Sequence, residues 1–215
     1  MSSKEQVRFN PYNPCGETSV SNRNLPHWEQ PQGCYFITYR LVDSIPQNLI
    51  LELRIERDDW LKKHPKPWDE STRREFGRLF TKREQDWLDA GYGGCHLRLP
   101  KVRTLIVSCL EKFDEVRYDV DCYTLMPNHV HLIWQMRDEY TNKRELQSLK
   151  GVSARKCNKY FNQTGSFWMD ESYDRLIRDK EELNAFRKYI ESNPSKAGLS
   201  EDHYSLQLNH RLTCY

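Results

Sequence analysis

Hydrophobic positions along this chain change between a strand period and a helix period several times. Residues 34–41 (Cys-Tyr-Phe-Ile-Thr-Tyr-Arg-Leu) are mostly β-branched or aromatic and predict a first strand. Segments 119–126 and 129–136 predict two further strands, and the Met-Pro-Asn turn signal between them indicates a hairpin. A short extended segment is expected over 172–177.

Between these strands, apolar residues at helical spacing predict helices. The predicted helices cover residues 47–62, 70–90, 100–113, 143–161 and 180–192. The alternation of leucines in the first of them also admits a strand. Glycines 91, 93 and 94 indicate a turn, and Pro194 is expected to end the last helix.

The order strand, helix, hairpin, helix, strand predicts an α+β fold. It is the order of a ferredoxin-like split βαβ antiparallel sheet, and we expect the helices to lie on one face of it. The region 47–94 is longer than this plan needs, so it is interpreted as a helical insertion. Residues 1–32 are expected to form an N-terminal arm, 33–200 one domain, and 201–215 a C-terminal tail.

Composition narrows the class of protein. The 215 residues are 37% hydrophobic and 30% charged, which predicts one domain with a large surface, and the net charge of +2 is too small to indicate a partner. No apolar run approaches the ~20 residues of a membrane span, and no apolar signal region opens the chain. Seven scattered cysteines without a Cys-x-x-Cys pair are interpreted as reduced thiols of a cytoplasmic protein.

Two histidines begin the second strand of the predicted hairpin. Because side chains alternate along a strand, His129 and His131 leave the same face of the sheet. Paired imidazoles suit several divalent metals, and a site with only one more amide or carboxylate keeps a position for a phosphate oxygen. A strand can also carry two histidines for packing or hydrogen bonding, so that interpretation stays open.

Tyr189 and Asn193 stand four residues apart on the last predicted helix, so a phenol and an amide share one helix face. With the histidines they suggest a metal-assisted tyrosine nucleophile acting on a phosphodiester. Tyr189 could equally cover the margin of the core, and Asn193 could be a terminal helical residue before Pro194. Tyr173 is the second candidate nucleophile, ranked lower because it lacks a polar partner four residues away on a helix.

The segment 143–160 is strongly basic and is followed by aromatic residues. Its cations are Lys143, Arg144, Lys150, Arg155, Lys156 and Lys159. Cations beside aromatic rings are typical of single-stranded nucleic-acid binding, although a solvated helix face is the alternative. Arg175 and Arg178 are candidate phosphate contacts, or else partners of Asp174 and Asp179.

Four segments, taken in order and spacing, resemble the REP-associated tyrosine transposases. They are 123–132 (Tyr-Thr-Leu-Met-Pro-Asn-His-Val-His-Leu), 165–168 (Gly-Ser-Phe-Trp), 172–179 (Ser-Tyr-Asp-Arg-Leu-Ile-Arg-Asp) and 189–199 (Tyr-Ile-Glu-Ser-Asn-Pro-Ser-Lys-Ala-Gly-Leu). That group belongs to the HUH single-tyrosine transposases, relatives of the small insertion-sequence transposases. The resemblance covers about 33–200. Ser195 replaces a frequent valine, and the segments before Pro100 and after Leu199 depart from the pattern, so DNA target and oligomeric state do not carry over.

The resemblance implies a ferredoxin-like transposase core that cleaves and rejoins single-stranded DNA near palindromic hairpins through a 5′-phosphotyrosine. It implies Tyr189 as nucleophile, with His129, His131 and Asn193 holding Mg²⁺ or Mn²⁺. No nucleotide cofactor is expected, in agreement with the absence of a Gly-x-x-x-x-Gly-Lys loop. We expect a monomer or homodimer in the cytoplasm, associated with the nucleoid and not with a membrane. The alternatives are a DNA-binding regulator of the same fold that does not cut, and a metal-dependent nuclease that uses water.

Overall fold

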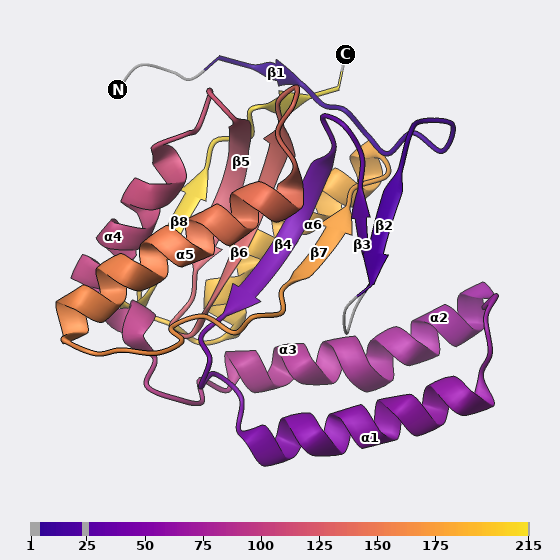
Figure 1. Cartoon of the computed structure of the whole chain (residues 1–215), viewed down its shortest axis with the longest axis horizontal. Helices are drawn as coiled ribbons and strands as arrows, with labels where there is room; N and C mark the ends of the chain where they lie inside the picture. Colours follow the sequence, from indigo (N-terminus) through magenta and orange to yellow (C-terminus); the bar gives the residue numbers. More distant parts are fainter. Residues whose placement is uncertain (1–4, 23–25, 215) are drawn as a thin grey trace.

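The computed structural model describes residues 5–22 and 26–214. Its centre is a five-stranded antiparallel sheet with the strand order β7-β4-β6-β5-β8 (Figure 1). The strands are β4 (Cys34–Arg40), β5 (Tyr118–Leu125), β6 (His129–Met136), β7 (Tyr173–Leu176) and β8 (Ser205–Leu208). The first four strands have the order of a split βαβ sheet, so the predicted ferredoxin-like fold class is confirmed.

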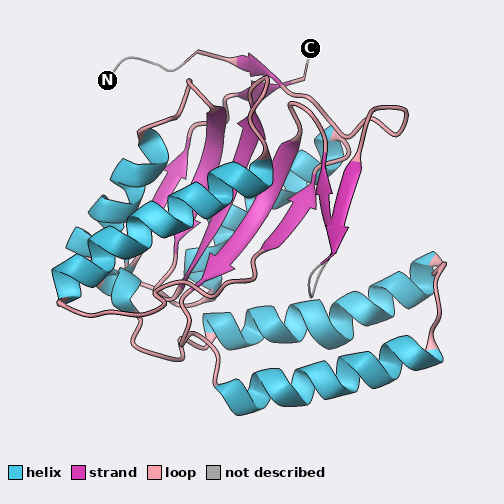
Figure 2. Ribbon diagram, viewed as in Figure 1, coloured by secondary structure: helices cyan, strands magenta, loops and turns pink. Residues whose placement is uncertain are grey.

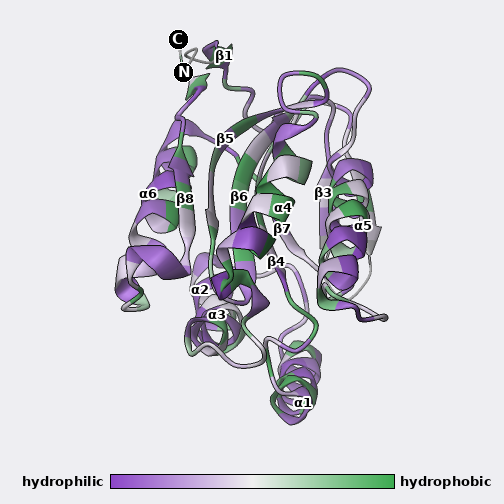
Figure 3. Ribbon diagram, turned by 90° about the vertical axis from the view of Figure 1, so that its left-hand side faces the viewer, coloured by the Kyte–Doolittle hydropathy of each residue, from purple (hydrophilic) through white to green (hydrophobic). Residues whose placement is uncertain are grey.

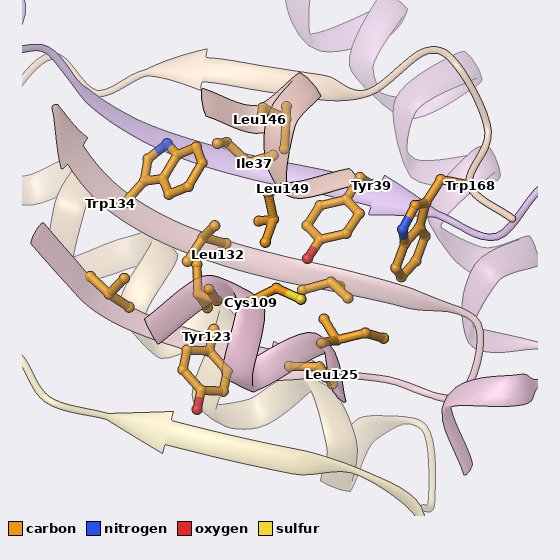
Figure 4. Close-up of a cluster of buried hydrophobic side chains, with 14 of the residues drawn as sticks. Ile37, Tyr39, Cys109, Tyr123, Leu125, Leu132, Trp134, Leu146, Leu149 and Trp168 are labelled. Carbon is orange, nitrogen blue, oxygen red and sulfur yellow. The ribbon is translucent and has the colours of Figure 1, made fainter. Parts of the chain in front are cut away.

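Three long helices cover the sheet: α4 (Pro100–Glu111), α5 (Asn142–Phe161) and α6 (Lys180–Lys196). Ile37 and Leu132 face α4 and α5 in the main hydrophobic core, part of which Figure 4 shows. Phe36 and Ile133, their neighbours along the strands, face α6 in a second core. The expectation that the helices lie on one face is therefore wrong. Every residue of β5 and β6 is buried, so both faces of the sheet need a cover.

The region between β4 and α4 forms a helical hairpin beside the sheet (Figure 2). Its elements are α1 (Gln47–Lys63), α2 (Glu70–Phe76), the π-helical turn η1 (Gly77–Thr81) and α3 (Lys82–Asp89), and the short 3₁₀ helix η2 (His96–Arg98) follows. The predicted helical insertion is confirmed. Buried Leu53, Trp60 and Phe80 hold its two arms together.

The N-terminal arm contains three short strands, which the sequence pattern did not indicate: β1 (Val7–Arg8), β2 (Ser19–Asn22) and β3 (Pro26–Glu29). β2 and β3 form a hairpin that lies beside β7 in Figure 1. The imidazole of His27 in β3 connects this hairpin to the body, because its Nδ1 pairs with Asp174 and its Nε2 lies 2.7 Å from Glu171 Oε1. The arm is thus attached to the edge of the sheet.

The segment 201–215, expected as a tail, is part of the domain in its described residues. After the 3₁₀ helix η3 (Glu201–His203), β8 pairs with β5 as the fifth strand, and β9 (Leu212–Thr213) pairs with β1. The prediction that Pro194 ends the last helix is also wrong. The helix α6 continues to Lys196, because a proline in its last turns removes a single backbone donor.

The hydropathy of the chain follows these layers. In Figure 3 the hydrophobic residues gather along the central strands, whereas the helices present polar residues outward. None of the described helices is long and apolar enough to cross a membrane.

Candidate active site

The central strand β6 presents two histidines to the face that α6 covers. The rings of His129 and His131 are fully buried, on the same side as Ile133. Each ring has its Nδ1 engaged: Asn128 Oδ1 lies 2.8 Å from Nδ1 of His129, and Thr38 Oγ1 lies 2.7 Å from Nδ1 of His131. The two Nε2 atoms face each other at 3.0 Å. Both imidazoles are therefore held with the same nitrogen directed to one point.

The helix α6 brings Tyr189 and Asn193 to this point. Buried Leu183 and Ile190 give α6 the apolar stripe by which it packs on the sheet. The ring of Tyr189 then lies edge-on to that of His131, with 5.1 Å between centroids, and Asn193 Nδ2 lies 3.4 Å from His131 Nε2. The structure brings together the four residues that the sequence singled out.

Burial controls the protonation of the site. It lowers the pKa of His129 to about 3. Burial and the neighbouring His129 lower the pKa of His131 well below its usual range, so both imidazoles are in the neutral, metal-binding form. Burial, followed by the carboxylate of Asp89, raises the pKa of the Tyr189 phenol. A positive charge at the site would lower the pKa of this phenol.

The donor atoms fit a small divalent cation. Asn128 Oδ1 can only accept, so Nδ1 of His129 carries the hydrogen and its Nε2 keeps a lone pair. Two ligand atoms at about 2.1 Å from a cation, placed at right angles, are about 3.0 Å apart. That is the separation of the two Nε2 atoms. Asn193 Oδ1 is buried without a hydrogen-bond partner in the described chain, and turning its amide over would direct this oxygen to the same point.

The other candidate nucleophile lies farther from the histidines. Tyr173 is on β7, and β4 separates that strand from the histidine strand β6. Its ring contacts Phe36, with 6.3 Å between centroids. The geometry therefore favours Tyr189 over Tyr173.

The basic helix and the histidines lie on opposite faces of the sheet. The six cations of 143–159 are on α5, which packs on the face of Ile37, whereas the histidines face α6. Lys143 and Lys150 line a hollow of about 490 Å³ beside β3, together with Trp168. Lys150 also donates to Asp170 O and Ser172 Oγ. The structure does not bring the predicted DNA-binding helix next to the site.

Arg175 and Arg178 lie nearer to α6, and both contact the same carboxylate. Arg175 Nη2 is 2.9 Å and Arg178 Nη2 is 3.2 Å from Glu182 Oε1. The suggested ion pairs with Asp174 and Asp179 are wrong, because Asp174 pairs with His27 and Asp179 caps α6. To act as phosphate contacts, these arginines would have to bind DNA phosphates in addition to, or in place of, Glu182.

Sequence reasoning missed three side chains around the histidines: Thr38, Asn128 and Asp89. Thr38 pairs with His131 across the strands, a register that only the fold establishes. Asn128 belongs to the Met-Pro-Asn turn signal, and its position directly before His129 is the signal that could have identified it. Asp89 belongs to the insertion, and its Oδ1 lies 4.0 Å from His129 Nε2. No three His, Cys, Asp or Glu side chains of the described chain form a ready metal-binding group.

One comparison with known families agrees with the sequence motifs. The family model described as "Transposase IS200 like" matches residues 101–193, which include His129, His131, Tyr189 and Asn193. The chain is also similar to a solved structure described as "Structure of the REP associates tyrosine transposase bound to a REP hairpin". The identity is 14% and the TM-score 0.47, over 84% of this chain and 77% of that chain. A comparison with curated proteins gives no match. The resemblance to the insertion-sequence transposases is thus confirmed over 101–193.

Proposed function

We propose, from the match of residues 101–193 to the IS200-like transposases, that this protein is a DNA strand transferase that cleaves and rejoins single-stranded DNA. The observation that carries the proposal is the meeting of Tyr189 with His129, His131 and Asn193 on one face of β6. Sequence motifs far apart in the chain converge there on donor spacings that suit one cation. A DNA-binding protein that does not cut would not need this combination of nucleophile and ligands.

In the proposed reaction the Tyr189 oxygen attacks the phosphorus of a phosphodiester and gives up its proton. The bond from phosphorus to the 3′ oxygen breaks, and that oxygen keeps the electron pair and takes a proton, leaving a 3′-hydroxyl. The 5′ phosphate is then covalently linked to Tyr189. Rejoining runs in reverse, with a 3′-hydroxyl attacking the phosphotyrosine, so it requires no nucleotide cofactor.

The side chains of the site have separate tasks. His129, His131 and Asn193 would hold Mg²⁺ or Mn²⁺, which supplies positive charge to a phosphate oxygen and to the developing phenolate. The ring of Tyr189 packs edge-on against His131 and Phe36, and these contacts restrict its orientation beside the histidines. A buried phenol is a weak nucleophile at neutral pH, so attack would require positive charge beside its oxygen.

The proposed substrate is a single strand next to a palindromic hairpin. Arg175 and Arg178, on the same side of the sheet as α6, are the proposed contacts for the strand that enters the site. The cations of α5 would bind phosphates on the opposite face, which suits a DNA that is wide enough to reach around the sheet edge. A duplex stem carries two phosphate backbones and therefore offers these cations more phosphates than a short single strand does.

The test is the capture of the covalent intermediate. We expect hairpin DNA labelled at its 3′ end, incubated with the protein and Mn²⁺, to give a labelled protein band on a denaturing gel. The Tyr189→Phe variant should lose this band completely, because it has no nucleophilic oxygen, and should bind the DNA with unchanged affinity in a gel shift. The matched control Tyr173→Phe should keep the band.

Each other outcome would reject a part of the proposal. An adduct that persists in Tyr189→Phe but disappears in Tyr173→Phe would move the nucleophile to β7. DNA cleavage with many turnovers and no adduct would identify water as the nucleophile. Binding without cleavage would identify a regulator.

A further inference from the structure

The helical insertion carries a carboxylate to the edge of the candidate active site. Asp89 is the last residue of α3, outside the segment that matches the transposase family. Its Oδ1 lies 4.0 Å from Nε2 of His129, the atom that faces His131. The side chain is 31% exposed, whereas His129 is fully buried. The carboxylate therefore combines partial exposure to solvent with proximity to the buried imidazole of His129.

Asn128 connects this carboxylate to the histidine strand. Its Oδ1 lies 2.8 Å from His129 Nδ1, and its Nδ2 donates to Leu88 O at 3.1 Å and to Tyr92 O at 3.2 Å. Leu88 directly precedes Asp89 in α3, and Tyr92 follows it three residues later. One fully buried amide thus orients His129 and holds the backbone on both sides of Asp89.

Further contacts hold the helical insertion at the two points where it joins the domain. Leu88 is buried against Ile45 and Ile50 where the chain leaves β4. At the return, Gly94 N donates to Asp43 Oδ2 at 2.7 Å, and Gly93 has φ +82° with no room for a Cβ beside Asp43 O. Gln85 Nε2 donates to Asp89 Oδ1 at 3.0 Å. These contacts fix the backbone on both sides of Asp89, so the distance from its carboxylate to the histidines depends on side-chain rotation.

A carboxylate would supply a ligand type that the other candidate ligands lack. Two neutral imidazoles and one amide supply no negative charge, and nitrogen donors favour softer metals over Mg²⁺ and Mn²⁺. A carboxylate oxygen is the donor that these two cations prefer. Rotation of the Asp89 side chain toward His129 Nε2 would add it to the imidazoles and to Asn193.

We propose that Asp89 is a ligand of the catalytic cation, contributed by the helical insertion, and that Asn128 is the residue that positions it. The inference rests on the proposed function in assuming a cation at the histidines. It adds a fourth ligand from a segment that the family match does not include. The insertion thereby acquires a role: it completes the metal site and selects hard cations.

The experiment is a metal titration of the full-length protein without DNA. We expect Asp89→Asn to weaken Mn²⁺ binding about 10-fold or more, followed by calorimetry or by the electron paramagnetic resonance signal of free Mn²⁺. Binding of Ni²⁺, which favours imidazole, should change by less than about threefold. Asp86→Asn, which removes an exposed carboxylate three residues earlier on α3, is the matched control and should leave Mn²⁺ binding unchanged. A thermal unfolding curve shows whether each variant is folded.

Several results would overturn the proposal. Unchanged Mn²⁺ affinity in folded Asp89→Asn would do so, and so would an equal loss in Asp86→Asn, which would indicate long-range electrostatics. Unchanged affinity with slower adduct formation would instead assign Asp89 to the Tyr189 phenol. Because the titration contains no DNA, its result is independent of whether Tyr189 forms an adduct, so the two proposals can fail separately.

Discussion

At the scale of single residues, the site depends on hydrogen bonds to the outer nitrogens of the imidazoles. Asn128 and Thr38 engage the two Nδ1 atoms, which leaves both Nε2 atoms directed inward. Such partners set the tautomer and ring orientation of a metal-binding histidine. The two imidazoles would otherwise be ordinary buried histidines, which is the alternative that the sequence left open.

Thr38→Val should therefore impair metal binding without altering the shape of the core. Valine keeps the volume of threonine but removes the hydroxyl that holds His131. We expect Mn²⁺ affinity to fall about 10- to 100-fold and stability to fall by about 1 kcal/mol, measured by calorimetry and urea unfolding.

Thr124 provides the matched control for this prediction. It pairs with His131 from the other neighbouring strand, and its hydroxyl contacts Met126 Sδ. Thr124→Val should leave Mn²⁺ affinity within about twofold of the parent, since it removes no bond to the imidazole. Equal losses in the two variants would show that the Thr38 hydroxyl has no particular role.

At the scale of elements, one buried ion pair connects α6 to the sheet in addition to its apolar stripe. Arg187 Nε and Nη2 donate to the two oxygens of Asp121 on β5, at 2.7 and 2.6 Å. Asp121 is fully buried, and Leu212 N also donates to it, at 2.9 Å. The pair joins α6, the sheet and the C-terminal segment. We expect this pair to help position Tyr189 and Asn193 over the histidines.

Arg187→Met should destabilise the protein by about 3–5 kcal/mol, because Asp121 would remain buried without its cation. Urea unfolding followed by circular dichroism measures the loss. Adding Asp121→Asn to this variant should recover part of the lost stability, because it removes the unpaired charge. The control Lys188→Met, at an exposed position on α6, should cost less than about 0.5 kcal/mol. A small effect of Arg187→Met would mean that packing alone positions α6.

At the scale of the whole molecule, the C-terminal segment is part of the fold and not an appendage. Arg211 is 1% exposed and bonds Asp114 Oδ1 at 3.0 Å and Asp119 Oδ1 at 3.1 Å. β9 pairs with β1, so the two ends of the described chain lie together in Figure 1. The sheet, its fifth strand and both ends of the chain are therefore stabilised together.

Removal of residues 201–215 should prevent stable folding. It takes away β8 and exposes the edge of β5, and Asp114 and Asp119 lose the buried guanidinium of Arg211. The summed cost approaches the ~5–15 kcal/mol by which domains are stable. Circular dichroism and size exclusion should show an unfolded or aggregated chain, whereas the full-length variant His203→Ala, at an exposed site, should unfold like the parent. A truncated protein with a normal unfolding transition would contradict this account.

Much of the fold was predictable because its elements are local patterns. Alternation placed His129 and His131 on one face of a strand, and helical spacing placed Tyr189 and Asn193 on one face of a helix. Other features were not predictable. β8 is a short, half-polar strand whose pairing with β5 is a contact between distant residues. The arm likewise has no period that would indicate its hairpin.

The sequence by itself determined the order of the central strands and helices, the ferredoxin-like class and the candidate residues for the proposed chemistry, since these depend on spacing between near neighbours. Only the tertiary structure decided that α6 covers the histidine face, that α5 covers the opposite one, and that the insertion returns Asp89 to His129. The reason is physical. Periodicity records which side of an element is buried, whereas the element that buries it is chosen by packing between residues far apart in the chain.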